Sequence, residues 1–164
     1  MRNNRSQVVG VVAAVTLAGC ELIAPPGGVG LTGAVYTDVH VDAPCEGQQG
    51  PEELSQVVLT FSDPSGSVLG TATTGPLSVE EMPHGPGTEG WAHGGCRFLA
   101  AYAVRLPVAD AYAVEFDPPD PPANPNAGYF DGANQLEPAT TTYAELAADG
   151  FTWSFEAPPA YVVP

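Results

Sequence analysis

The chain has 164 residues, with 19 acidic residues against four arginines and no lysine, and its formal net charge is −15 at pH 7. A negative field of this size repels phosphate backbones and excludes nucleic acid as a partner. With 19 glycines, 18 prolines and only 14% charged residues, the composition favours short strands and loops over long helices.

The first 20 residues have the pattern of an export signal. Arg2 and Arg5 precede an apolar run over 8–18, which has the length of a signal-peptide hydrophobic region. It is too short for a membrane-spanning helix, which needs about 20 residues. The run ends in Leu-Ala-Gly-Cys at 17–20 and resembles a bacterial lipobox. That resemblance implies cleavage before Cys20 and attachment of acyl chains such as palmitate to Cys20. The alternative is an ordinary secretory signal with an accidental cysteine.

Cleavage before Cys20 would leave one domain of modest size. We expect a signal peptide over 1–19, a lipidated tether over 20–32, a domain over 33–157 and a flexible tail over 158–164. The mature chain would carry two arginines against 19 acids, a net charge of −17. Anionic lipid head groups repel such a domain, so its membrane attachment would depend on the acyl chains of Cys20.

The two remaining cysteines, Cys45 and Cys96, are predicted to pair in a disulfide bond. An exported protein with two spare cysteines usually pairs them. The alternative is a metal site with two thiolate ligands, although the sequence has no Cys-x-x-Cys spacing.

The first part of the domain alternates polar and apolar residues as strands do. In 33–42, one face carries Val35, Thr37, Val39 and Val41, and the other carries Tyr36, Asp38, His40 and Asp42. A second strand is predicted over 56–61. Asp63-Pro64-Ser65-Gly66 then fits a type I turn that leads into a hairpin partner over 67–73.

The middle of the chain predicts one short helical turn and two further strands. Residues 78–81 read Ser-Val-Glu-Glu and fit a helix capping box, with Pro83 limiting the helix to one turn. A glycine-rich loop follows to residue 95. The clearest core strand is predicted over 96–106, and a shorter one begins at Asp110.

Residues 117–140 contain six prolines and predict a long loop of the kind that is usually functional or mobile; a short strand at 128–130 is an option within it. A capping box at Thr142–Glu145 opens a short helix over 143–148, with Gly150 at its end. Residues 151–155 place three aromatic side chains on one face of a final strand.

Six to seven short strands, one short helix and one disulfide predict a mostly β fold, an antiparallel β-sandwich. The chain resembles small uncharacterised lipoproteins of high-GC Gram-positive bacteria. The matching pieces are the lipobox, Cys45, the hairpin over 57–69, Gly94 to Phe98, Tyr112 to Phe116, Tyr143 to Leu146 and Gly150 to Trp153. Residues 33–35 and 57–68 also resemble carboxypeptidase-regulatory or transthyretin-like sandwiches. These resemblances imply an immunoglobulin- or transthyretin-like fold and assign no catalytic residue.

Three polar clusters are candidate metal sites, each with a simpler interpretation. Asp38, His40 and Asp42 share one strand face and suit zinc or another divalent metal, yet a solvated strand face is the favoured explanation. Residues 117–137 offer oxygen ligands for calcium without the spacing of an EF-hand. His84 and His93 lie near Cys96, which the disulfide would occupy. We therefore predict no cofactor and no metal.

The sequence has no motif for nucleophilic catalysis and no phosphate-binding loop followed by lysine. We predict a non-enzymatic lipoprotein on the extracytoplasmic face of the cell membrane, acting as a binding or structural module for an unknown ligand or envelope protein. The alternatives are a calcium- or zinc-binding module and an unrecognised envelope hydrolase.

Overall fold

The computed structural model describes residues 27–39, 44–48, 50–82, 95–120 and 131–158. The lipobox with Cys20, the residues His40 and Asp42, the histidines at 84 and 93, and the optional strand at 128–130 lie outside the described residues. The elements are β1 (Val29–Val39), η1 (Glu52–Gln56), β2 (Val58–Ser62), β3 (Val68–Thr73), β4 (Leu77–Glu81), β5 (Cys96–Leu106), β6 (Ala111–Asp117), η2 (Asp131–Gln135), β7 (Ala139–Thr142), α1 (Tyr143–Ala148) and β8 (Phe155–Glu156). Among the described residues, no helix has the length and apolar character needed to cross a membrane.

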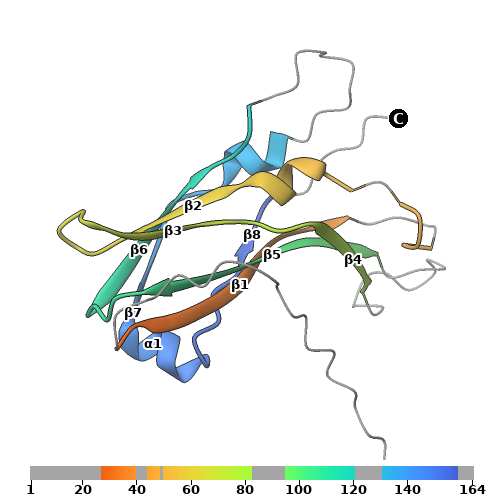
Figure 1. Cartoon of the computed structure of the whole chain (residues 1–164). Coiled ribbons are helices and arrows are strands. Elements are labelled where there is room, and N and C mark those ends of the chain that lie inside the picture. Colours follow the sequence, from red (N-terminus) through yellow and green to blue (C-terminus); the bar gives the residue numbers. More distant parts are fainter. Residues whose placement is uncertain (1–26, 40–43, 49, 83–94, 121–130, 159–164) are drawn as a thin grey trace, which may run out of the picture.

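The fold is mostly β, as the sequence predicts, with two four-stranded sheets facing each other (Figure 1). One sheet has the order β4-β5-β1-β8 and the other β3-β2-β6-β7. All pairings are antiparallel except that of β8, which runs parallel to β1. The described residues form eight strands, where the sequence predicts six to seven.

The predicted alternation of apolar and polar residues is confirmed along β1 and β5. Val35 and Thr37 of β1 are fully buried, whereas Tyr36 and Asp38 between them are partly exposed. On β5 the inward residues include Phe98, Ala100, Tyr102 and Leu106. Together with Leu59 and Phe61 of β2 and Tyr112 and Val114 of β6, they form one core between the two sheets.

The predicted hairpin turn between β2 and β3 is confirmed. The Gly66 amide donates to the Asp63 carbonyl oxygen at 2.9 Å, and Gly66 has a φ of 83°, which glycine adopts without steric cost. Hydrogen bonds from the Ser65 hydroxyl and then the Ser67 amide hold the pKa of the Asp63 carboxyl below its ordinary value. Hydrogen bonds to both the main chain and the side chain of Asp63 therefore hold the turn closed.

The predicted helix is confirmed as α1. Thr142 caps it, and the Glu145 carboxylate accepts the Thr142 amide at 2.8 Å in a full capping box. Hydrogen bonds from the Thr142 amide and then its hydroxyl lower the pKa of Glu145. Gly150 follows with a φ of 66°, as expected just past a helix end.

The helical turn predicted over 78–81 is wrong, because these residues lie in β4. Their backbone pairs with β5, from Leu77 opposite Ala100 to Glu81 opposite Cys96, and the Ser78 hydroxyl donates to the Leu99 carbonyl. A capping-box sequence is compatible with a strand, and the neighbouring strand determines the outcome here.

Several strand bounds also differ from the prediction. Strand β2 begins at Val58 instead of residue 56, and β7, which was not predicted, begins at Ala139 within the loop expected over 117–140. Strand β1 begins at Val29, so residues 29–32 of the expected tether belong to the sheet, where Leu31 is buried. The final strand is restricted to β8, and Thr152 before it forms only an isolated bridge with Thr32.

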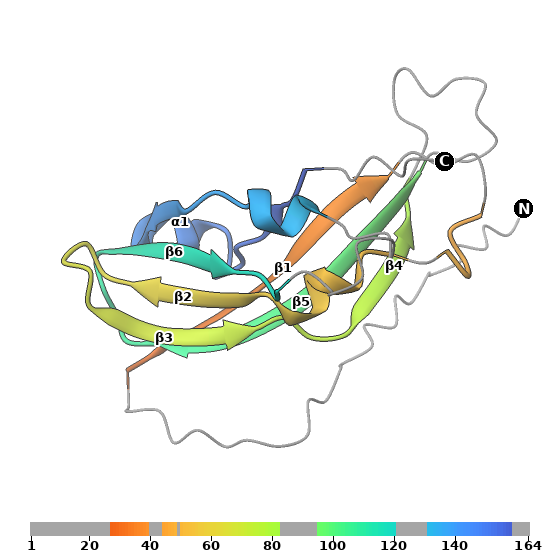
Figure 2. The ribbon, with the colours of Figure 1, turned by 90° about the horizontal axis from the view of Figure 1, so that it is seen from above.

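The register separates two ends of the sandwich (Figure 2). Val29 lies opposite Leu106 at one end, together with the β2–β3 turn and α1. Val39 lies opposite Cys96 at the other end, beside the disulfide. A chain that enters at Val29 therefore reaches the domain at the end remote from the disulfide.

Candidate functional site

The Asp38 carboxylate is bound by an arginine of the neighbouring strand. Arg97 Nε donates to Asp38 Oδ1 and Nη2 donates to Oδ2, each at 2.7 Å. The two residues lie directly opposite each other in the β1–β5 register. Asp38 is therefore engaged by a cation of the protein itself, and the described residues contain no cluster of three or more histidine, cysteine, aspartate or glutamate side chains that could hold a metal ion.

The same arginine connects Asp38 to two further side chains on the outer face of the sheet. The Arg97 guanidinium lies 4.4 Å from the centre of the Tyr36 ring, a favourable cation–π distance. The Tyr36 hydroxyl donates to Glu156 Oε2 of β8 at 3.5 Å. Partial burial, followed by the Glu156 charge, raises the pKa of Tyr36, and the hydrogen bond that Arg97 donates to Asp38 raises the pKa of Arg97.

The predicted disulfide between Cys45 and Cys96 is confirmed, with an S–S distance of 2.05 Å. Both cysteines are buried beside Phe98, so solvent has little access to the bond. The disulfide consumes both thiols and rules out a metal site that uses them as thiolate ligands.

An open groove of about 880 Å³ lies where the edges of the two sheets separate. One wall is formed by residues 134–139, which lead from η2 into β7. The other is formed by residues 153–158, around β8. The groove is thus bounded by the last strand of each sheet.

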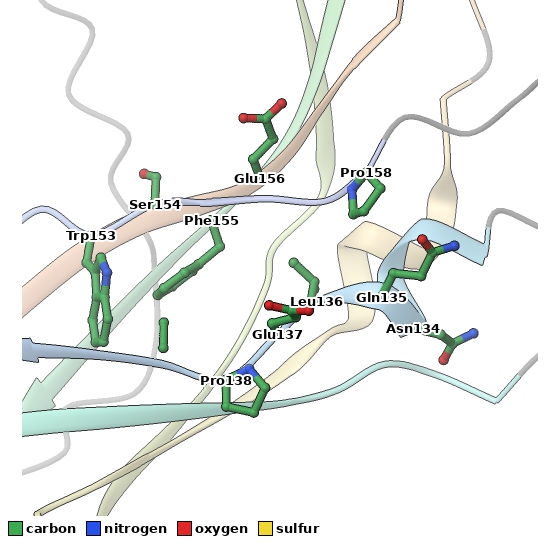
Figure 3. Close-up of a pocket in the computed structure, with 11 residues that line it drawn as sticks. Asn134, Gln135, Leu136, Glu137, Pro138, Trp153, Ser154, Phe155, Glu156 and Pro158 are labelled. Atoms are coloured by element: carbon green, nitrogen blue, oxygen red, sulfur yellow. The ribbon is translucent and has the colours of Figure 1, made fainter.

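Side chains divide sharply between the two sides of the 153–158 segment (Figure 3). Trp153 and Phe155 point toward the 134–139 wall, whereas Ser154 and Glu156 point to the opposite side. The Trp153 and Phe155 rings pack 4.9 Å apart, and Phe155 meets Phe116 of β6 edge-on at 4.8 Å. The aromatic floor of the groove is therefore continuous with the core and held in place by it.

Among the described residues, the main chain of β8 is paired on one side only. The Trp153 amide donates to the Thr32 carbonyl at 2.9 Å, and the Ala157 amide donates to the Tyr36 carbonyl at 2.7 Å. Main-chain groups of alternate residues point to opposite sides of a strand, so those of Ser154 and Glu156 point away from β1. Within the described part of the chain, β8 is the last strand of its sheet.

The groove carries polar groups suited to binding. Its lining includes Glu137 and the amide of Gln135 beside Leu136, whereas the Glu156 carboxylate points to the opposite side. The arrangement combines an apolar floor with acceptors and donors at its rim, as ligand sites commonly do.

The sequence pattern predicts Trp153 and Phe155 on one face, and the two side chains do point to the same side, although only Phe155 lies in β8. The pattern gives no reason to bring them beside 134–139, so the groove could not be predicted from it. The sequence does contain an aromatic-rich segment and a proline- and amide-rich segment, and these are the two segments that form the groove.

Comparison of the chain with protein-family models, with curated proteins and with solved structures gave no significant match. The class of protein that fold and site define is therefore a mostly β, disulfide-bonded domain with an open groove at the sheet edges.

Proposed function

We propose that the protein is an exported lipoprotein, anchored to the extracytoplasmic face of the cell membrane through acyl chains on Cys20. In this proposal the domain is a non-catalytic binding module, built as a sandwich of the immunoglobulin or transthyretin-like type. Its ligand belongs to the cell envelope.

The observation that carries the proposal is the lipobox at 17–20, directly after an apolar run of signal-peptide length. The buried disulfide between Cys45 and Cys96 supports it, because such bonds persist in oxidising compartments outside the cytoplasm. The acidic surface supports acyl chains rather than head-group contacts as the source of membrane attachment.

The groove supports a binding role, and its position suits an anchored domain. The chain enters the fold at Val29, whereas β8 pairs with β1 only from Val35 onward. Six residues of strand separate these points, a distance of about 20 Å at 3.3 Å per residue. The β8 part of the groove would therefore lie away from the end at which the tether enters, whereas Trp153 lies nearer to that end, beside Thr32.

The anchor is tested by changing Cys20→Ala in the full chain and fractionating the cells that produce it. We expect loss of incorporated radiolabelled palmitate and loss of the protein from the membrane fraction. Cys96→Ala is the matched control, because it removes a different cysteine and should retain the label. A Cys20→Ala protein that still carries label and sediments with membranes would refute the proposal.

A further inference from the structure

The open edge of β8 is suited to receive one more strand. Ser154 and Glu156 direct their main-chain N–H and C=O groups away from β1, and both residues line the groove. No described strand pairs with that side. An extended peptide that adds to a sheet edge gains affinity from main-chain hydrogen bonds and specificity from alternate side chains.

The side chains of β8 define which residues such a strand would carry. Residues of the added strand that share a face with Phe155 would meet the apolar floor at Trp153 and Leu136. Residues that share a face with Glu156 would lie on the outer side, because successive side chains of a strand alternate between faces. The groove therefore selects for an alternating pattern.

Charge selects the outer residues. Glu156 is exposed, and its hydrogen bond from Tyr36 is long, at 3.5 Å, so the carboxylate retains acceptor capacity for a cation. Glu137 is an acidic residue that lines the groove itself. Of the two arginines in the domain, Arg97 is already bound by Asp38. The acidic surface attracts cations at long range and repels acidic peptides.

We infer that the groove binds an extended peptide segment in which apolar and basic residues alternate, and that this segment pairs with β8 as an added strand. This inference rests on the proposed function as a binding module and names the ligand class. The apolar side chains contact the partly exposed Trp153 and Leu136 above the buried Phe155, and a basic side chain lies beside Glu156.

The test uses the full chain in non-ionic detergent micelles and fluorescence anisotropy of a labelled peptide in which valine and lysine alternate over seven residues. Three comparison peptides separate the effects of reversing the charge, removing the charge and removing main-chain hydrogen bonds. One replaces lysine by glutamate, one replaces lysine by threonine, and one is N-methylated at alternate residues along one edge. We expect the glutamate and the N-methylated peptides each to bind at least about tenfold more weakly than the lysine peptide, a factor that corresponds to 1.4 kcal/mol.

Two single-residue variants, each of which removes one negative charge, locate the site. We expect Glu156→Gln to weaken the lysine peptide by about three- to tenfold and to leave the threonine peptide unchanged. Glu115→Gln is the control, because Glu115 is exposed on β6 and does not line the groove. If Glu156→Gln and Glu115→Gln weaken binding of the lysine peptide equally, the basic side chain does not lie beside Glu156.

Other outcomes overturn the inference in distinguishable ways. Equal affinity for the N-methylated peptide excludes strand addition. A chain ending at Pro158 that binds the peptide when the full chain does not would identify residues 159–164 as the occupant. Absence of binding by both chains removes the peptide ligand altogether, while palmitate labelling of Cys20 still decides the proposed anchor independently.

Discussion

Substitution of Gly33 by alanine should detach the segment that forms one wall of the groove. A Cβ atom at Gly33 would lie 1.8 Å from the Trp153 carbonyl oxygen and 2.7 Å from its carbonyl carbon, so the Trp153 main chain must move by more than 1 Å. That carbonyl accepts the Tyr102 hydroxyl at 2.6 Å, and the Trp153 amide donates to Thr32 at 2.9 Å. A displacement of this size breaks both hydrogen bonds.

Each broken bond that leaves a buried group unpaired costs about 1–3 kcal/mol, and the Gly→Ala change returns about 0.4–1 kcal/mol through the unfolded chain. We expect the free energy of unfolding to fall by about 2–4 kcal/mol. Urea unfolding of the full chain, followed by circular dichroism, measures this change. Tyr102→Phe removes the hydroxyl alone and should account for about 1–2 kcal/mol of it.

Gly30→Ala is the matched control on the same strand. A Cβ at Gly30 meets no atom within 4 Å. The free energy of unfolding of this variant should therefore equal that of the wild type or exceed it by up to about 1 kcal/mol. If Gly33→Ala and Gly30→Ala unfold at the same urea concentration, the contact between β1 and the 153–158 segment does not hold the groove wall, and the reasoning fails.

Three further predictions concern stability and charge. Replacing Cys45 and Cys96 by alanine opens a loop of 51 residues and should lower the free energy of unfolding by about 4 kcal/mol in the chain-entropy model; an unchanged urea midpoint would contradict it. The pKa of Asp63 is lowered in the fold, so its ionisation stabilises the fold above the ordinary aspartate pKa of about 4 and stops doing so as the pH falls through the lowered value. Asp63→Asn should therefore lose less stability than the wild type on acidification, and identical pH profiles would count against this. A double-mutant cycle on Asp38 and Arg97, whose side chains are 25% and 38% exposed, should give a coupling energy of about 0.5–1 kcal/mol that shrinks in high salt; a coupling insensitive to salt would contradict an ion pair.

Features encoded by neighbouring residues were predictable from the sequence. The bounds of β5 follow from its alternation and from Pro107 after it, and those of α1 follow from the Thr142–Glu145 capping box and Gly150. The turn at Asp63 follows from its proline and glycine. In each case the signal lies within a few residues of the element it specifies, and the disulfide was predicted from the cysteine count and the expected compartment.

Features that depend on distant partners were not predictable in this way. The segment at Ser78 becomes a strand because β5 is beside it, although its sequence also suits a helix start. Asp38 pairs with Arg97 only because the β1–β5 register places them opposite each other. The groove requires the parallel pairing of β8 with β1, about 120 residues apart in sequence, and no local pattern specifies such a contact.

The geometry of β1 has a mechanical consequence. A pull on the chain before Val29 acts along the strand axis, so it loads the hydrogen bonds to β5 and β8 together in shear rather than opening them one after another. If those bonds yield, the extracted segment ends at Cys45, which is covalently joined to the first residue of β5. The release is then limited to 16 residues, roughly 50–60 Å of extended chain. The disulfide therefore limits the length of chain that can be pulled out of the domain, and reduction of this single bond removes the limit.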